Sequence, residues 1–444
     1  MKRKLLYLFL LTSTISNAQW VSQATGFTTT SRGVTDINIV DANTVWALGY
    51  DGSGGGANVQ EFTRTSNGGT TWTSGAINIG NTALELTNIS PVSATTAWVG
   101  AVSPTNGMGG VWKTTNGGTT WTQQNATAYT NANSFFNVVH FFDANTGITQ
   151  GDPITATDFE VYRTTNGGTT WTAVPASSLP NIVSGEYGYN GGNVAAGNSF
   201  WFVTNKGKIY RTTDMGVTWT KYNTPITDFA GTSVGGTLLF SDNNNGILLG
   251  RNGSGTSATY TMYTTSNGGV LWSAGVPYTQ PYLSLSFIPG TTILVGTASN
   301  NTTFTYNSGY STDFGATWTP IDSGVQRTSI KFLDGTTGWA GGFTTSSTTD
   351  GIYKYTGANL GSDSFLASKF AIYPNPANDV ISIVSDNLLF ESISLTDING
   401  RVVKETNASS TTNFNLNISD LNAGIYFMKI KTADGILDKK IIKN

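Results

Sequence analysis

Short apolar segments alternate with polar turns along most of the chain. Val34–Val40 and Val45–Gly49 form one pair of such segments, and Phe135–Phe142 and Gly147–Gly151 form another. The same tetrapeptide, Asp-Ala-Asn-Thr, separates the two members of each pair, and this composition favours a tight turn. These segments therefore predict antiparallel β-hairpins.

A polar box of eight residues recurs at a regular spacing. Its copies read TSNGGTTW, TTNGGTTW (twice), TTDMGVTW, TSNGGVLW and STDFGATW. They end at Trp72, Trp121, Trp171, Trp219, Trp272 and Trp318, with gaps of 49, 50, 48, 53 and 46 residues. A hydroxyl and an Asn or Asp side chain two residues apart can hydrogen-bond turn amides, and glycine at the fifth position permits a positive φ. The box predicts a turn whose tryptophan begins the next strand and packs between units, and we assign it no catalysis.

The repeat predicts four strands per unit, and units of this kind arranged radially form a β-propeller. A seventh unit, Arg327–Tyr355, has three strands but no box. Residues 19–24, QWVSQA, match the segments that follow the boxes, so Trp20 is expected to take the place of the missing tryptophan. The sequence predicts an all-β fold, with a seven-bladed propeller over residues 19–356 whose last blade is closed by the N-terminal strand.

The box resembles the Asp-box, or bacterial neuraminidase repeat, of sialidases, sortilin-type receptors and photosystem II assembly-factor propellers. The resemblance covers roughly residues 20–356. It implies a fold and not an activity, because these families share the box and differ in function.

The N-terminus predicts export. Three basic residues, an apolar run from Leu5 to Leu11 and the small residues Ser16 and Ala18 are typical of a cleaved signal peptide over residues 1–18. The apolar run is far shorter than the ~20 residues of a spanning helix, and no later segment is long enough.

Composition narrows the function classes. The chain has no cysteine and one histidine, so we expect no disulfide, transition-metal site or cofactor. Its formal net charge of −3 and the lack of a basic run beyond the N-terminus argue against nucleic acid as a partner.

A second module follows a Gly/Ser-rich linker over residues 357–368. Residues 369–444 show short alternating strands that predict a small Ig-like β-sandwich. YPNPA (373–377), LTDINGR (395–401), LNAGIYFMKI (421–430) and the terminal KKIIKN resemble the type A C-terminal sorting domain of type IX secretion. The residues that carry this resemblance are Tyr373, Pro374, Asn375, Pro376, Gly400, Gly424, Tyr426 and Lys440. It implies a Bacteroidetes-type exporter as partner, and release or anchoring at the outer-membrane surface after passage through the periplasm.

A ligand site is expected on the face opposite the boxes. We call this the loop face: it carries the loops that lead into each innermost strand and the loops between the second and third strands. The candidate ligand-binding residues there are Arg32, Glu186, Tyr187, Tyr282 and Arg327. A sialidase would need an arginine triad for its substrate carboxylate, and Arg32-Gly33-Val34 stands where Arg-Ile-Pro is usual.

Other chemistries stay open. A propeller glycoside hydrolase would use two facing carboxylates, with Asp152, Glu186 and Asp228 as candidates, and Asp158 and Glu160 are further acids. Asp152 in GDP and Asp158 before Phe159 could as well cap loop turns. Asp51 in DGSGGG could hold calcium, although the spacing is not that of an EF-hand. His140 lies in an apolar strand and is expected to be a packed or channel-lining residue.

The sequence thus favours a monomeric, non-enzymatic binding protein for an extracellular protein or glycan. The alternatives are a secreted glycoside hydrolase and an assembly factor resembling those of photosystem II.

Overall fold

A computed structural model of the chain describes residues 19–124, 128–300, 305–357, 359–360, 370–385, 389–398, 400–407, 411–432 and 435–444. The predicted signal peptide and most of the predicted linker lie outside these residues. All the helices and strands of the described part are β-strands except two short 3-10 helices, η1 (Ala176–Ser178) and η2 (Gly255–Ser257). The all-β prediction is confirmed.

Five separate sheets have four antiparallel strands each, in sequence order. Their strands are β6 (Glu85–Pro91), β7 (Ala97–Val102), β8 (Gly109–Thr114) and β9 (Thr122–Gln123); β10 (Phe136–Phe141), β11 (Gly147–Gly151), β12 (Glu160–Thr164) and β13 (Thr172–Ala173); β14 (Gly188–Ala196), β15 (Ser199–Thr204), β16 (Lys208–Thr212) and β17 (Thr220–Asn223); β18 (Val234–Phe240), β19 (Gly246–Asn252), β20 (Thr259–Thr265) and β21 (Val276–Tyr278); and β22 (Ser284–Phe287), β23 (Leu294–Asn300), β24 (Thr305–Ser311) and β25 (Thr319–Ser323).

A larger sheet joins the first and last strands of this region. One half contains β2 (Arg32–Ile39), β3 (Val45–Asp51), β4 (Glu61–Thr65) and β5 (Thr73–Ala76), and the other contains β26 (Ser329–Phe332), β27 (Gly338–Ser346), β28 (Thr349–Tyr355) and β1 (Trp20–Ala24). The halves meet through one residue pair, Gly33 opposite Phe343. The N-terminal strand β1 pairs antiparallel with β28, with Trp20 opposite Tyr355, so the two ends of this region are held together.

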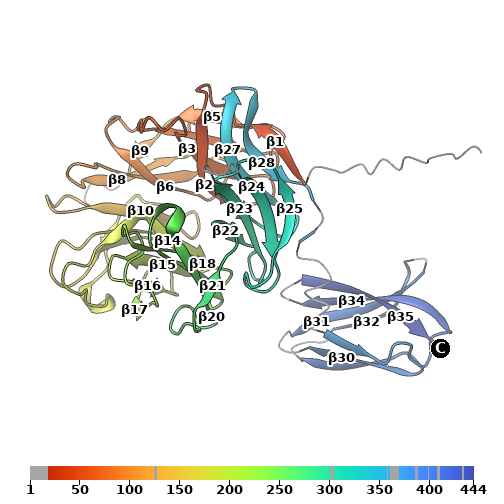
Figure 1. The fold of residues 1–444 in the computed structure, drawn as a ribbon. Helices are drawn as coiled ribbons and strands as arrows, with labels where there is room; N and C mark the ends of the chain where they lie inside the picture. Colours follow the sequence, from red (N-terminus) through yellow and green to blue (C-terminus); the bar gives the residue numbers. More distant parts are fainter. Residues whose placement is uncertain are drawn as a thin grey trace, which may run out of the picture.

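The sheets surround a common centre as in a β-propeller (Figure 1). Their innermost strands contact one another in the order β2, β6, β10, β14, β18, β22 and β26, and β26 contacts β2. Few backbone hydrogen bonds join neighbouring inner strands, and polar side chains make such connections instead. Asp36 accepts a hydrogen bond from the Ile89 amide at 2.6 Å, and Ser286 accepts one from the Phe332 amide at 3.1 Å.

The six boxes form the expected turns. The fifth residue has a positive φ in every copy, for example 83° at Gly69 and 89° at Gly315. The fourth residue also has a positive φ, even where it is Met215 (56°) or Phe314 (57°). Its amide donates to a carbonyl in the first hairpin turn of the same sheet, as from Gly68 to Asn43 O at 2.9 Å, and this bond helps hold the conformation in all six boxes.

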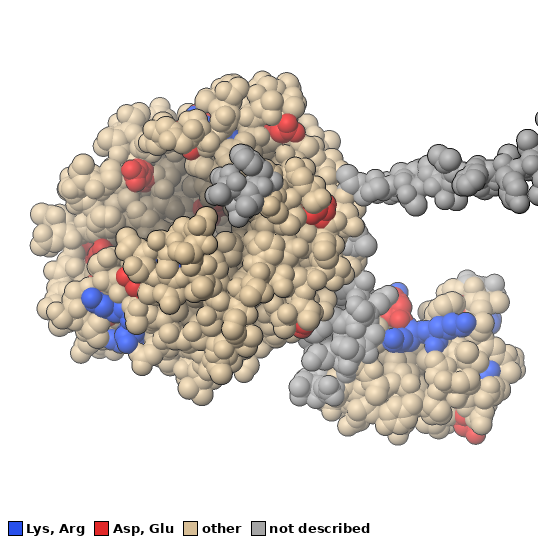
Figure 2. All heavy atoms as spheres, in the orientation of Figure 1, with Lys and Arg blue, Asp and Glu red and all other residues tan. Residues whose placement is uncertain are grey.

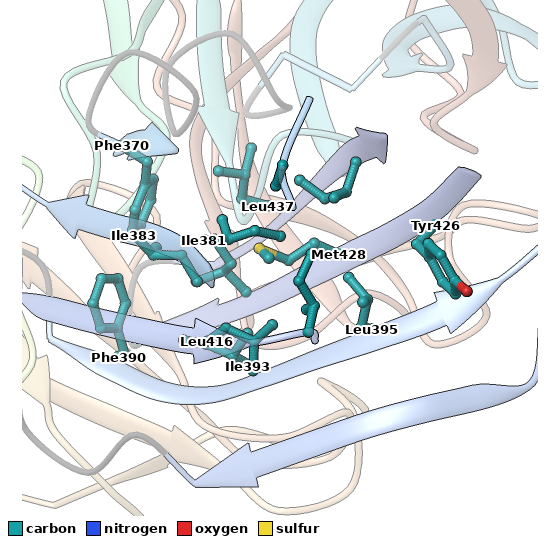
Figure 3. Close-up of a cluster of buried hydrophobic side chains, with 14 residues drawn as sticks. Phe370, Ile381, Ile383, Phe390, Ile393, Leu395, Leu416, Tyr426, Met428 and Leu437 are labelled. Carbon is teal, nitrogen blue, oxygen red and sulfur yellow. The ribbon is translucent and has the colours of Figure 1, made fainter. Parts of the chain in front are cut away.

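The C-terminal module consists of two sheets around one core. The first sheet has the order β29 (Phe370–Tyr373), β30 (Val380–Ser385), β33 (Asn413–Asn417), and the second has the order β32 (Val402–Asn407), β31 (Phe390–Asp397), β34 (Gly424–Thr432), β35 (Gly435–Lys443). Alternate residues of both sheets point inward, among them Ile381, Ile393 and Met428, and all three are fully buried (Figure 3).

Candidate functional site

Three of the predicted loop-face residues lie around the start of β14. Asp152, directly after β11, accepts hydrogen bonds at one carboxylate oxygen from Asn137 Nδ2 (2.7 Å) and from the Gly188 amide (2.8 Å). It thus links the sheet of β10 to that of β14. Burial raises the pKa of Asp152, although these two hydrogen bonds act in the opposite direction.

Glu186 is buried just before β14. Its carboxylate accepts hydrogen bonds from Thr204 Oγ1 (2.9 Å), Tyr210 OH (3.1 Å) and the Val183 amide (2.9 Å). Because both oxygens are used in this way, the side chain fixes the loop over residues 183–186 and leaves little carboxylate surface for a ligand.

Tyr187 is the exposed member of this group, with 44% of its surface accessible. Its ring packs edge-to-face on Tyr189, with centroids 5.6 Å apart. The Tyr189 hydroxyl donates to Asp228 Oδ1 at 2.5 Å, so Asp228 holds the second ring in place. We call Asp152, Tyr187, Tyr189 and Asp228 the Tyr187 cluster.

The other three predicted ligand-binding residues make separate structural contacts. Arg32 forms a two-point ion pair with Glu61, at 2.9 and 3.3 Å. Tyr282 is buried and stacks on Trp318 at 4.5 Å. Arg327 is 2% exposed and pairs with Asp322 at 2.9 and 2.6 Å. The side chains of Arg32, Tyr282 and Arg327 thus each contact residues outside the Tyr187 cluster.

The remaining acids make local contacts. Asp158 accepts hydrogen bonds from Thr155 and Thr157, and buried Glu160 accepts one from Tyr162 OH at 3.0 Å. Asp51 caps its own loop, and hydrogen bonds from the Ser53 side chain and from the Ala57 and Ser53 amides lower its pKa to about 2. Within the described ranges, no group of three or more His, Asp or Glu side chains could hold a metal ion.

The centre of the propeller holds charges that the sequence did not single out. A cavity of 670 Å³ is lined by Asp36, Lys331 and parts of five inner strands. The Lys331 side chain is exposed at the cavity wall. The surrounding protein nevertheless desolvates its ammonium group, and this lowers its pKa. Asp36 has a raised pKa for the same reason. Asp36 and Lys331 could have been found from the sequence as charged residues within predicted innermost strands.

His140 lies on the inner strand β10, as expected of a packed or channel-lining residue. Its ring contacts Phe142 at 4.6 Å and Phe200 at 5.3 Å. Burial, with a smaller contribution from the Lys331 charge, lowers the pKa of His140 to about 4. The imidazole is therefore neutral at pH 7.

The motif residues of the C-terminal module meet at one edge. The Asn375 side chain donates to Lys440 O at 2.8 Å and accepts from the Ile442 amide at 2.9 Å, so YPNPA lies beside the terminal strand β35. Tyr373 ends β29 and is exposed, and Gly400 occupies the β31–β32 turn with a φ of 79°. Gly424 pairs with Lys443, and the Tyr426 hydroxyl donates to Asn422 O at 2.9 Å. The peptide bonds before Pro374 and Pro376 are cis.

The family model of the secretion system C-terminal sorting domain matches residues 371–444. The C-terminal module is a type IX sorting domain. The chain is accordingly a type IX-secreted protein of the cell surface or extracellular space. In the part of the chain that is described, no helix has the length and apolar character needed to cross a membrane.

Solved structures resemble the propeller ahead of the sorting domain. YCF48 from Cyanidioschyzon merolae has a TM-score of 0.51 at 16% identity, covering 76% of this chain and 99% of that one. A GH74 xyloglucanase from Xanthomonas campestris has a TM-score of 0.48 at 12% identity, covering 82% of this chain and 59% of that one. No curated protein matches the chain. At these identities the likeness concerns the fold alone, and the function has to be inferred from this chain's own residues.

Proposed function

We propose that the mature protein is a seven-bladed propeller over residues 19–356, joined by a linker over 357–368 to an Ig-like sorting domain over 369–444, after removal of residues 1–18. The ring of inner strands supports this count when the larger sheet is divided at its single Gly33–Phe343 pair. The pairing of β1 with β28 supplies the fourth strand of the last blade.

We infer that this propeller is a non-enzymatic, monomeric binding protein, and that the Tyr187 cluster is its contact point for an extracellular glycan or protein. One observation carries the proposal: Tyr187 is exposed at the loop face while Tyr189, fixed by Asp228, supports its ring. A flat aromatic surface with few remaining rotamers can contact a sugar ring or an apolar side chain at little entropic cost.

The carboxylates near this surface favour binding over hydrolysis. A glycoside hydrolase needs one carboxylic acid and one carboxylate directed at the scissile bond. Glu186 is buried beneath three hydrogen-bond donors, and Asp152 and Asp228 each bridge two sheets. A residue that connects blades cannot move toward a substrate without loosening that connection.

The test uses the purified mature chain on glycan and peptide arrays, together with a reducing-sugar assay on every glycan that it binds. We expect retention without sugar release, and a loss of at least about tenfold in affinity for Tyr187→Ala. Tyr373→Ala is the control, because Tyr373 is a comparably exposed tyrosine in the sorting domain. Sugar release, or equal affinity of Tyr187→Ala and the parent chain, would overturn the proposal.

A further inference from the structure

One sheet of the sorting domain has apolar side chains on both faces. Along β34 the burial alternates: Tyr426, Met428 and Ile430 point into the core, whereas Ile425 and Phe427 point outward and are exposed. Figure 3 shows Tyr426 and Met428 on the core side of this strand. An antiparallel sheet with one face in water normally carries polar residues on that face.

The outward apolar residues occupy neighbouring positions on three of the four strands, with Thr396 of β31 between Phe427 and Val402. Ile425 stands opposite Ile442 of β35, and Phe427 stands opposite Thr396 of β31, which in turn faces Val402 of β32. We call these four apolar residues the outer strip. Their exposed fractions are 40% for Ile425, 46% for Phe427, 38% for Ile442 and 53% for Val402.

The strip does not serve the core of the module. The core lies on the other side of the sheet, where fourteen buried residues form one cluster. Scattered exposed apolar residues are ordinary, but a contiguous group on neighbouring strands marks a contact surface.

Charge around the strip indicates the chemistry of its partner. Lys440 lies directly opposite Phe427. Two other lysines on this face have acidic neighbours: Lys431 pairs with Glu391 at 3.0 Å, and Lys429 stands opposite Asp438. Lys440 forms no ion pair with any described residue, so a carboxylate beside the apolar contact would complement it.

We propose that the outer strip docks the sorting domain on a protein of the type IX secretion machinery, which supplies an apolar pocket with an acidic residue at its edge. The sorting-domain assignment requires a protein that recognises this module, and the strip has both the apolar surface and the uncompensated cation of a recognition site. A second copy of this chain fits less well, because a two-fold contact through the strip brings two Lys440 ammonium groups to one interface.

The proposal is independent of ligand binding by the Tyr187 cluster. Its failure would leave array binding by the purified chain intact, and a failed array experiment would leave export unchanged. The two can therefore be told apart.

The test expresses the full chain in a bacterium with an active type IX system and compares the medium and cell surface with the periplasm by immunoblot. Phe427→Thr and Ile442→Thr keep β-forming residues at outward positions, so the fold should persist. We expect each to lower the exported fraction about tenfold, with accumulation in the periplasm. Lys440→Glu should have a similar effect, and Lys440→Arg should export normally.

Val380→Thr is the matched control. Val380 is 42% exposed on β30, in the other sheet of the module. Unchanged unfolding midpoints of the purified full-length variants, with normal export of Val380→Thr, complete the expected result. Normal export of Phe427→Thr and Ile442→Thr would overturn the proposal, as would an equal export defect in Val380→Thr. A shift from dimer to monomer on gel filtration without any export defect would assign the strip to self-association instead.

Discussion

Lys354 Nζ donates a hydrogen bond to the carbonyl oxygen of Gly68 at 2.6 Å, across 286 residues of sequence. Lys354 belongs to the last propeller strand, and Gly68 is the fourth residue of the first box. Equivalent bonds connect neighbouring sheets elsewhere: Arg64 to Gly117 O, Lys113 to Gly167 O and Arg163 to Met215 O. The cation directly before each of the first three boxes thus holds the following box, and Lys354 extends the series to the point where the ring closes.

Lys354→Met should destabilise the propeller by about 1–2 kcal/mol, because it removes a charge-assisted hydrogen bond together with the contact of the ammonium with the Trp339 ring. The free energy of unfolding in urea measures this loss. Lys206→Met, at an exposed lysine, is the control and should change stability little. Equal effects of the two variants would contradict the role assigned to Lys354.

Much of this architecture could be predicted because it repeats. The fifth-position glycine and the box tryptophan follow from local chemistry, and six copies make that pattern visible. The contact between Lys354 and Gly68 could not be predicted in this way, since it joins a unit without a box to one that has a box, and its partner atom is a backbone carbonyl with no sequence signature.

The fifth box departs from the others in a way that can be tested. In the first box, Asn67 Nδ2 donates to Thr71 Oγ1 at 2.9 Å, but the equivalent residue in the fifth box is Leu271, which is 70% exposed. Leu271→Thr supplies the missing hydroxyl and should stabilise the protein by about 0.5–1 kcal/mol in urea unfolding. Val276→Thr, at a similarly exposed position outside a box (63%), should have no such effect. A loss of stability in Leu271→Thr would contradict this account of the box.

His140 should make stability depend on pH. Its folded-state pKa of about 4 lies below its ordinary value of 6.5, so the unfolded chain binds the proton first as pH falls. The stability that this gives is complete above pH 6.5 and is lost between pH 6.5 and 4, by about 3 kcal/mol. Asp36, with a raised pKa, acts in the opposite direction, so the parent chain should be compared with His140→Gln. Unfolding of both proteins at pH 7.5 and 4.5 should show the smaller loss in the variant, and parallel losses would rule out His140 as the source.

The site was less predictable than the fold. Asp152, Glu186, Tyr187 and Asp228 could be selected because their place before or after a strand puts them on the loop face. Their hydrogen-bond partners could not, because Asn137, Gly188 and Thr204 lie on the strands β10, β14 and β15, and the sequence does not show which acid each of them contacts. Arg32 and Arg327 illustrate the same limit, since a carboxylate of this chain already pairs with each guanidinium group.

Arg327 helps to hold the N-terminal strand β1 in the ring. Its guanidinium lies over the Trp20 ring at 5.0 Å and pairs with Asp322, and Asp322 also accepts a hydrogen bond from Ser308 Oγ at 2.5 Å. Trp20 Nε1 donates to the same Ser308 hydroxyl at 3.0 Å. These contacts join β1 to β24 and β25 through one buried cation.

Arg327→Met should therefore cost about 3 kcal/mol, because it leaves the Asp322 carboxylate without its cation in a largely buried position. Adding Asp322→Asn to this variant should recover part of the loss, since the unpaired charge is then removed. Arg327→Lys should lose nearly as much stability as Arg327→Met, because an ammonium group cannot reproduce the two-point contact. Urea unfolding of Arg327→Met, of Asp322→Asn and of the double variant measures the coupling between the two residues. Additive losses would show that they act independently.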